Sequence, residues 1–417
     1  MTKRPEHLSI LAPESFRQVI SRRALFQIGG AAAGLAILSA CGSNDDDVSG
    51  ATSGGTVAPS GTGAASDLLA QYSNVINKSS GQLAMFTWGE YNDPTIVGSL
   101  AESALGVTMK VDYYPSNEDL ITKLSASNGN SGFDIVVPTG PYVPQMIEKG
   151  LLQKFDKAKL PNMVNVDPLY LAQAWDPTND YSVCKNWGST GFFYDTTKIT
   201  RELTTWADFI DACMNEASGK CSVLDAGPNV TGMYFWANGI DWTTEDPADL
   251  DACEAFLVDE FAQHIKGFDS YPSTAIAEGQ FDISMVWNGD ARAAYGRLVD
   301  VGANPQDWKW VLAGPDTELW MDNYCIPTGA PNPDAAHAWI NWLLTPEVSI
   351  TDLEYHGYHS GMKNIDQLIA ELAPEITYAD MIFFTDEQVA TMNTGAVNGA
   401  QDRLIEIYDK VKAKAAG

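Results

Sequence analysis

The sequence predicts an α/β fold in which mainly parallel sheets are flanked by helices. Short apolar or β-branched runs alternate with segments of helical spacing from residue 83 onward. Such alternation is typical of parallel strands that are connected by helices. The chain has 417 residues, of which 45% are apolar, so it is long enough for two or three domains and can fill their cores. A disordered protein is therefore excluded.

The expected strands and helices follow one another in the order that an α/β chain requires. Apolar, β-branched or aromatic runs predict strands at 83–88, 107–113, 133–137, 283–287 and 308–312. Apolar residues three and four positions apart predict helices at 96–104, 118–126, 206–215, 250–266, 335–344 and 403–412. Pro346 marks the end of the helix expected at 335–344, because proline interrupts a helix.

The first 41 residues predict an export signal. Arg22 and Arg23 precede an apolar stretch rich in Gly and Ala, and small residues then lead up to Cys41. The stretch is shorter than the about 20 residues that span a membrane. Small residues before a cysteine are typical of bacterial lipoprotein signals, so we expect lipidation at Cys41 and an anchored protein on the extracytoplasmic or periplasmic side. The arginine pair fits both the twin-arginine route and the general secretion route.

Residues 42–80 predict a flexible tether between this anchor and the folded part. They are rich in Ser, Gly, Thr and Ala and include three successive aspartates at 45–47. Such a composition offers little apolar surface to bury. The tether would hold the folded part away from the membrane surface.

The charge of the chain excludes one class of function. There are 25 Lys and Arg against 54 Asp and Glu, which gives a formal net charge of −29. Such a surface repels phosphate backbones, so we expect no nucleic-acid partner. The chain also contains 12 Trp and 16 Tyr, and we expect part of this aromatic set to face a ligand.

The cysteines after Cys41 leave two alternatives open. Export permits disulfides, and Cys213 and Cys221 are the closest candidates for a local pair. Free thiols at these positions are the alternative. The five cysteines have no CxxC spacing, which argues against a thiolate zinc cluster; they are Cys184, Cys213, Cys221, Cys253 and Cys325.

No motif in the sequence predicts catalysis, a metal site or a cofactor. None of four catalytic or cofactor-binding motifs occurs in a fitting structural context. These are the nucleophile elbow, the zinc-protease helix motif, the phosphate-binding loop and the dinucleotide-binding fingerprint. His356 and His359 are close in sequence, but the Gly between them favours a turn and no third ligand is nearby. A secreted hydrolase that uses a carboxylate pair lacks a supporting motif.

Three short segments combine tryptophan with a carboxylate, each expected beyond the end of a predicted strand. They are Trp88 with Glu90 and Tyr91, Trp287 with Asp290, and Trp320 with Asp322. Ligands of open α/β sheets bind beyond the carboxyl ends of strands. An aromatic face beside a carboxylate binds organic cations, because the ring attracts the charge and the carboxylate adds a charge-assisted hydrogen bond. The alternative is that the rings belong to the core and the acids to caps or solvated turns.

Four segments together carry a resemblance to a known family. They are residues 86–91 (FTWGEY), 133–139 (FDIVVPT), 287–290 (WNGD) and 320–327 (WMDNYCIP). These segments resemble the spermidine/putrescine-binding proteins of bacterial ABC importers, and the likeness continues in order from about residue 83 to the C-terminal end. The resemblance implies a two-lobed periplasmic-binding-protein fold of type II. Each lobe would be a mainly parallel sheet flanked by helices, and the ligand would bind in the cleft between the lobes.

The resemblance also implies how the chain is divided. Lobe 1 would comprise residues 81–187 and about 322–358, and lobe 2 residues 188–321 and about 359–417. The chain would cross between the lobes near Trp187 and again near Asp322.

The resemblance further implies a set of ligand contacts in which Asp322 is an amine anchor and Trp287 and Trp320 are aromatic walls. At Pro228 and Asn229 the sequence departs from the family, which commonly has a glutamate there, so one anchor is missing or supplied by another residue. The full set is Trp88, Glu90, Tyr91, Thr139, Asp225, Trp287, Asp290, Trp320, Asp322 and Tyr358.

The function implied by the resemblance is that of a lipid-anchored solute-binding protein. It would be a monomer that closes its lobes on putrescine or spermidine and delivers this polyamine to the permease subunits of an ABC importer. No cofactor, metal or catalysis is implied. The alternatives are the same fold with another organic cation or an amino-acid derivative as ligand, and a sensor of polyamines.

Overall fold

The computed structural model describes residues 67–373 and 376–416. The export signal, Cys41 and the tether up to residue 66 lie outside the described residues. Within them, residues 67–71 and 367–373 form one unit, and residues 72–366 with 376–416 form a second, larger unit. Apart from residues 367–373, the features below belong to the second unit.

Lobe 1 is built on a parallel sheet in the order β2–β1–β3. Its strands are β1 (Gly81–Thr87), β2 (Val107–Tyr113), β3 (Ile135–Val136) and the short β4 (Leu152–Gln153). Its helices are α3 (Ala101–Leu105), α4 (Asn117–Ala126), α5 (Val143–Glu148), α11 (Pro333–Leu343) and α12 (Pro346–His356). The central strand β3 is buried and β1 is buried over its second half, as expected of strands covered by helices, whereas most of the edge strand β2 is exposed or half-buried.

Lobe 2 is built on a second parallel sheet in the order β7–β6–β8. Its strands are β6 (Cys221–Leu224), β7 (Ile265–Asp269), β8 (Ile283–Trp287) and β9 (Trp308–Val311). Its helices are α6 (Trp206–Met214), α7 (Gly227–Asn238), α8 (Pro247–Glu254), α9 (Pro272–Ala277), α10 (Asn288–Asp300) and α15 (Gln401–Ala415). Three further elements are α13 (Ile365–Leu372), α14 (Asp386–Val389) and β11 (Met392–Asn393).

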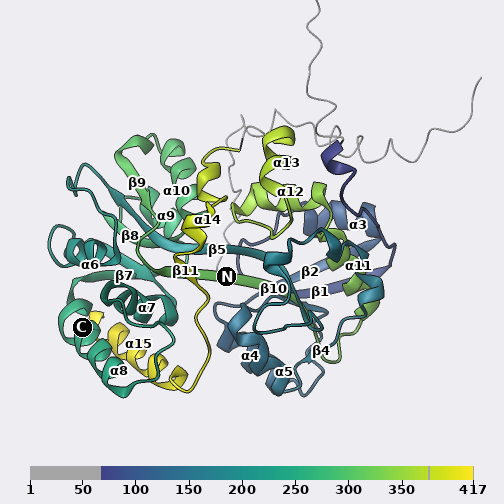
Figure 1. The fold of residues 1–417 in the computed structure, drawn as a ribbon, viewed down its shortest axis with the longest axis horizontal. Coiled ribbons are helices and arrows are strands. Elements are labelled where there is room, and N and C mark those ends of the chain that lie inside the picture. The colour runs from purple at the N-terminus through teal and green to yellow at the C-terminus, as the bar shows by residue number, and fades with distance from the viewer. Residues whose placement is uncertain (1–66, 374–375, 417) are drawn as a thin grey trace, which may run out of the picture. The chain divides into compact units, whose positions relative to one another are not determined.

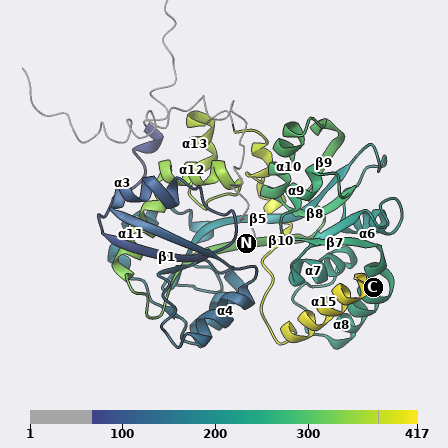
Figure 2. The ribbon, with the colours of Figure 1, turned by 180° about the vertical axis from the view of Figure 1, so that it is seen from behind.

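Two long antiparallel strands belong to both lobes. They are β5 (Ser182–Asp195) and β10 (Thr317–Pro327), and Figures 1 and 2 show them running side by side from the strands of one lobe to those of the other. β10 pairs with β3 in lobe 1 and β5 pairs with β8 in lobe 2, so all the strands on this path form one mixed sheet. The expected crossings near Trp187 and Asp322 fall within these strands, where Met321 pairs with Trp187 and Asp322 with Asn186.

The hydrophobic side chains form a separate core for each lobe. One core is centred on β1, β3 and α11 and reaches Trp187 on β5 and Trp320 on β10. The other is centred on β6, α6 and α7 and reaches Phe192 on β5. A two-lobed α/β fold was expected from the sequence, and it is confirmed; the prediction of mainly parallel sheets holds for each lobe, with β5, β9 and β10 as antiparallel members.

Two segments lie elsewhere than the sequence-based boundaries suggest. Residues 359–363, expected in lobe 2, pair with lobe 1: the backbone N–H of Trp187 donates to the carbonyl of His359, and Met362 bridges Val166. The end of the expected tether is also docked on lobe 1. The N–H groups of Ser73 and Val75 donate to the side chains of Asn165 and Asn162 at 2.8 and 3.0 Å.

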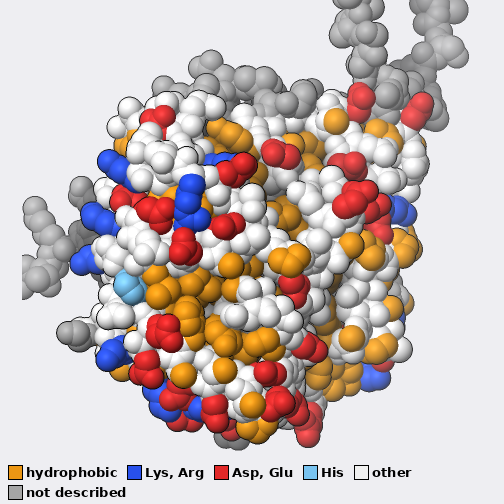
Figure 3. Space-filling model, turned by 60° about the vertical axis from the view of Figure 1, so that its left-hand side comes forward, with side chains coloured by type: hydrophobic (Ala, Val, Ile, Leu, Met, Phe, Trp, Pro, Cys, Tyr) orange, Lys and Arg blue, Asp and Glu red, His pale blue; other side chains and the backbone are white. Residues whose placement is uncertain are grey.

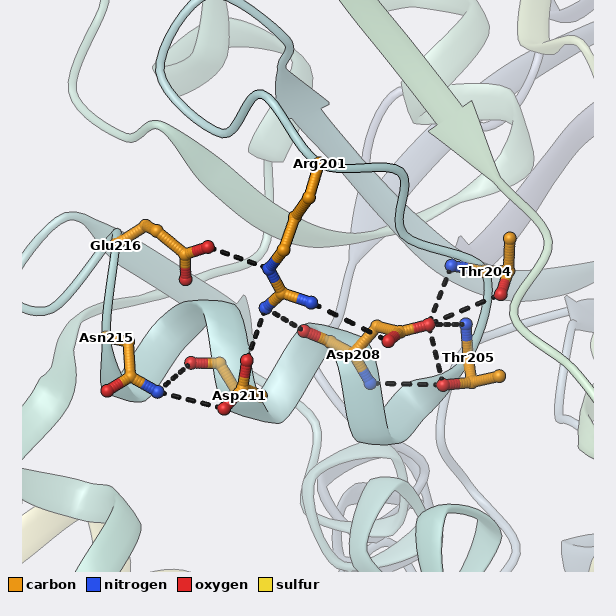
Figure 4. Close-up of polar contacts among 7 residues, drawn as sticks. All are labelled: Arg201, Thr204, Thr205, Asp208, Asp211, Asn215 and Glu216. Atoms are coloured by element: carbon orange, nitrogen blue, oxygen red, sulfur yellow. Dashed lines mark hydrogen bonds and ion pairs between the residues drawn. The ribbon is translucent and has the colours of Figure 1, made fainter.

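The local sequence signals explain how α6 begins. Thr205 accepts a hydrogen bond from the N–H of Asp208, whose carboxylate accepts one from the N–H of Thr205, forming a capping box. Arg201 lies across this helix and pairs with Asp211 and Glu216 at 2.5 and 2.7 Å (Figure 4). The start of α6 is therefore held by its own caps and by a surface ion-pair network.

The helix expected at 250–266 is confirmed except at its end, and a second expectation is wrong. The chain is helical from Pro247 to His264 and then turns into β7 at Ile265, which pairs with Cys221. The third tryptophan–acid segment does not follow a strand but lies inside β10. The aromatic and apolar residues around it form an extended run that is buried along its whole length.

The structure decides between the two alternatives for the cysteines. Cys213 and Cys221 are free thiols, as are the other three described cysteines, and all five are buried. Both side chains belong to the core of lobe 2, and the Cys221 thiol donates to the carbonyl of His264 at 3.2 Å. They act as small apolar residues in this core.

The surface reflects the acidic composition. On the face shown in Figure 3, acidic side chains are scattered among hydrophobic ones. Among the described residues no helix is long and apolar enough to span a membrane.

Candidate functional site

The crossover strands present one continuous face of polar and aromatic side chains. Side chains alternate along a strand, so Glu318, Trp320 and Asp322 of β10 point to the same side. On β5, Gly188 lies opposite Trp320, and its missing side chain makes room: a Cβ atom there would come within 2.5 Å of the Trp320 ring. The two strands thus carry two acids with a tryptophan between them, where the chain passes from lobe to lobe.

Asp322 is a buried carboxylate held from lobe 1. The Thr139 hydroxyl, in the loop after β3, donates to its Oδ1 at 2.7 Å. Thr139 is itself oriented by Asn117 at the start of α4, which exchanges two hydrogen bonds of 3.0 Å with it. Burial raises the pKa of Asp322 to about 6, although the hydrogen bond from Thr139 acts in the opposite direction.

Asp290 is a second, half-buried carboxylate in the first turn of α10 in lobe 2. It accepts a hydrogen bond of 3.0 Å from the hydroxyl of Tyr358, which follows α12. Burial raises the pKa of Asp290 to about 6. The close approach depends on Gly289, where a Cβ atom would lie 2.4 Å from the Tyr358 ring. This contact joins the two lobes.

Aromatic rings surround these two acids. The Tyr358 ring meets Trp320 edge to face at 4.7 Å and Tyr91 at 6.1 Å between ring centroids. The Tyr91 hydroxyl is buried and close enough to Asp322 to help lower the pKa of that carboxyl, and the indole N–H of Trp320 is buried without a hydrogen-bond partner among the described residues.

Three expected residues lie at the edge of this cluster. The indole N–H of Trp88 donates to the carbonyl of Val137 at 3.0 Å, which places Trp88 beside the strand that leads to Thr139. Trp287, at the end of β8, is partly buried against the cores of both lobes. Glu90 lies opposite Arg297 of lobe 2, with 3.8 Å between charged atoms.

Asp225 stands apart from the buried acids. Its carboxylate accepts hydrogen bonds from Tyr408 and Lys412 of α15, the latter at 2.6 Å. An acid that is already neutralised by a lysine has little charge left for a ligand. Its partners come from the other end of the chain, so no local sequence pattern could reveal this pairing.

Sequence reasoning missed Glu318. This residue is 8% exposed, and burial raises its pKa to about 7. Its carboxylate accepts hydrogen bonds from Thr190 on β5 and from Asn229 on α7. Asn229 is one of the two positions at which, by the resemblance, this chain lacks the family's glutamate. The period of two in Glu318, Trp320 and Asp322 was the available signal, but it is informative only once β10 is recognised as a strand.

Sequence reasoning also missed a buried charge network behind Tyr91. The Lys185 ammonium donates to the carbonyl of Tyr91 at 2.9 Å and pairs with Asp352 at 3.3 Å. Burial alone would raise the pKa of Asp352, but Lys185 and His356 hold it well below its usual range. Burial lowers the pKa of His356 to about 4, so this imidazole is neutral at physiological pH.

The arrangement is suited to binding an organic cation. Among the described residues, no basic side chain forms an ion pair with Asp290, Glu318 or Asp322. Buried carboxylates are costly unless they are paired, and a ligand ammonium would pair with them. Within the same described ranges no three His, Cys, Asp or Glu side chains converge in a way that could hold a metal ion.

Comparison with known proteins agrees with the fold. The sequence pattern of the bacterial extracellular solute-binding proteins matches residues 95–381. The chain belongs to this family. This chain is 30% identical to the spermidine/putrescine-binding periplasmic protein of Escherichia coli over 337 residues. The aligned region covers 79% of this chain and 91% of that relative.

Two solved structures are similar to this chain over 99% of their own length. A putative spermidine/putrescine ABC transporter protein from Listeria monocytogenes has a TM-score of 0.71 and 25% identity, covering 80% of the chain and 99% of that protein. A lipoprotein of Treponema pallidum has a TM-score of 0.65 at 25% identity, with coverages of 80% and 99%. These neighbours confirm the two-lobed fold of this solute-binding protein.

Proposed function

We propose that this protein binds a linear polyamine, putrescine or spermidine, on the extracytoplasmic side and delivers it to the permease of an ABC importer. One observation carries the proposal: among the described residues, no basic side chain forms an ion pair with the buried Asp322 or the half-buried Asp290. These acids lie among Tyr91, Trp320 and Tyr358, where the two lobes meet. Relatives named for spermidine and putrescine binding support the choice of ligand.

The proposed mechanism is closure of the lobes on the ligand. Tyr358 and Asp290 come from different lobes, as do Glu90 and Arg297, so these contacts exist only when the lobes are together. We propose that the ligand pairs with Asp322, held from lobe 1, and with Asp290 of lobe 2. It then binds the closed state more tightly than the open state, and therefore favours closure. The relatives are binding proteins, and we propose that no bond is made or broken here either.

The roles of the individual residues follow from their positions. Asp322 and Asp290 pair with amino groups, Trp320, Tyr91 and Tyr358 enclose the alkyl chain, and Thr139 fixes the Asp322 carboxylate. The remaining expected contacts, Trp88, Glu90 and Trp287, border the site. We propose no ligand contact for Asp225, because Lys412 already pairs with it.

The finer localisation is also a proposal. Lipidation at Cys41 would tether the protein as a monomer to the membrane, close to the permease. The Treponema pallidum neighbour is described as a lipoprotein, which supports this view.

Isothermal titration of the purified protein tests the function. We expect saturable binding of putrescine or spermidine, weaker binding of agmatine and no binding of GABA or maltose. A folded protein that binds none of the amines would overturn the proposal. Binding of GABA in preference to polyamines would assign the fold to an amino-acid derivative.

A further inference from the structure

Glu318 is a buried carboxylate whose hydrogen-bonding capacity is only partly used by the protein. Its Oε2 atom accepts hydrogen bonds from the Thr190 hydroxyl and the Asn229 amide. No hydrogen bond to Oε1 and no ion pair to this side chain occurs within residues 67–373 and 376–416. Neutral donors alone do not offset the burial of a charge.

A comparison with Asp352 shows what is missing. Asp352 is similarly buried, but it pairs with the Lys185 ammonium and also accepts a hydrogen bond from the N–H of Asp93 at 2.8 Å. The pKa of Asp352 lies below its usual range, whereas burial raises that of Glu318 to about 7. The difference is the cation, which the chain supplies to Asp352 and does not supply to Glu318.

The position of Glu318 relates it to the proposed ligand site. Glu318 and Asp322 lie four residues apart on one face of β10, about 13 Å along the strand at roughly 3.3 Å per residue. Trp320 lies between them on the same face of the strand. From lobe 1, Tyr142 is close enough for the charge of Glu318 to contribute to its raised pKa, after burial and Glu118. Glu318 therefore faces the region where the lobes meet.

We propose that Glu318 is a third acidic contact for the ligand, which binds an amino group on the side of Trp320 away from Asp322. This inference rests on the proposed function and specifies its substrate class. The ligand is a linear cation with amino groups near both ends, long enough to extend along Trp320 from Asp322 to Glu318. A triamine such as spermidine fits this requirement, whereas a short diamine pairs with Asp322 and Asp290 and does not reach Glu318.

The test compares two ligands on three proteins. Spermidine and putrescine are titrated calorimetrically into the wild type, Glu318→Gln and Glu347→Gln at pH 7. The glutamine in the first variant keeps an oxygen that can accept from Thr190 and Asn229 but cannot carry charge. Glu347, in the first turn of α12, is the matched control because it is also 8% exposed and burial raises its pKa.

Affinity is the first readout. Losing a hydrogen bond to a charged group corresponds to about 10-fold to 100-fold in binding. We expect Glu318→Gln to lower the affinity for spermidine by this factor and to change the affinity for putrescine by less than about threefold. Glu347→Gln is expected to bind both ligands like the wild type.

Proton release is the second readout, and a structural role would not affect it. A carboxyl group that is half protonated at pH 7 releases about half a proton when an ammonium binds to it. We expect this release with spermidine in the wild type, measured in buffers of different ionisation enthalpy, and its loss in Glu318→Gln.

The outcomes separate the two proposals. If the wild type binds spermidine and Glu318→Gln binds it with unchanged affinity and proton release, the role of Glu318 is refuted and the function stands. If Glu318→Gln loses equal affinity for putrescine and spermidine, the role of Glu318 is also refuted, because the effect then does not depend on the length of the ligand. If the folded wild type binds neither polyamine, both the function and the role of Glu318 are refuted.

Discussion

The ammonium nitrogen of Lys185 lies 3.8 Å from the centre of the Tyr91 ring. The protein thus places a cation of its own against a ring that we propose to contact a cationic ligand. The same ammonium binds the Tyr91 carbonyl and Asp352, so Tyr91 is fixed through its backbone as well as its ring. A rigid aromatic wall loses little conformational freedom when the ligand binds.

Replacing Lys185 by methionine is expected to destabilise the protein strongly. Asp352 would remain buried without its cation, and breaking one half of a buried ion pair costs about 3–5 kcal/mol. Chemical unfolding of the variant measures this loss. The double variant Lys185→Met with Asp352→Asn removes both charges and is expected to recover part of the stability. A single variant as stable as the wild type would show that the pair is unimportant.

Asp322→Asn is expected to weaken polyamine binding about 10-fold to 100-fold, because a charge-assisted hydrogen bond is lost. Calorimetric titration measures the change. Asp225→Asn serves as the comparison, since Asp225 is occupied by Lys412, and its affinity is expected to stay within about twofold of the wild type. A loss in Asp225→Asn as large as in Asp322→Asn would return Asp225 to the set of ligand contacts.

Polyamine affinity is expected to fall as the pH decreases from 8 to 5. Burial raises the pKa values of Asp290 and Asp322 to about 6, and a ligand ammonium binds their ionised forms. Protonation at pH 5 therefore weakens binding by about tenfold for each group. The amines keep their charge over this range, and burial lowers the pKa values of His356 and His359 to about 4 and about 3.

Titrations at several pH values check this dependence. In Asp322→Asn the profile is expected to be shallower, because one of the titrating carboxyl groups is gone. An affinity that is constant between pH 5 and pH 8 would contradict the assignment of both acids.

Gly289→Ala is expected to weaken polyamine binding and closure. The added methyl group would meet the Tyr358 ring and the His356 carbonyl at 2.4 and 2.7 Å, which separates Tyr358 from Asp290. Gly296→Ala, in the same helix α10, is a matched control because nothing lies within 4 Å of its added atom. Equal binding by both variants would mean that the contact between Tyr358 and Asp290 is dispensable.

Cys41→Ser is expected to release the protein from the membrane. The thiol that would carry the lipid is then missing, while the folded lobes are unchanged in sequence. Fractionation of cells that express the two proteins measures the change. Membrane retention of the variant equal to that of the wild type would argue against lipidation at Cys41.

The sequence was sufficient for local features and for the resemblance, but not for pairings between distant segments. Six residues come together as one cluster, although they belong to five segments that are far apart in the sequence; they are Tyr91, Thr139, Asp290, Trp320, Asp322 and Tyr358. Strands such as β1 and β8 and helices such as α4 could be told apart in the sequence, because the spacing of apolar residues changes from a period of two in strands to 3.6 in helices.

What the sequence did not show depends on β5 and β10. Both strands are buried on both faces, so their residues do not alternate between apolar and polar, and Lys185 and Glu318 occur within them. The charge on Lys185 is compensated by Asp352, which is 167 residues away in sequence. No local pattern encodes such a partner.

The shared strands also affect the order in which the protein can assemble. Lobe 1 needs β10 to pair with β3 and β4, and it needs α11 and α12 to complete its core. These elements are synthesised only after β6, β7 and β8 of lobe 2, so the amino-terminal part of the chain leaves the ribosome with an incomplete sheet. Lobe 1 must therefore wait for segments that follow lobe 2, and a chain truncated before residue 317 would expose an unpaired apolar edge.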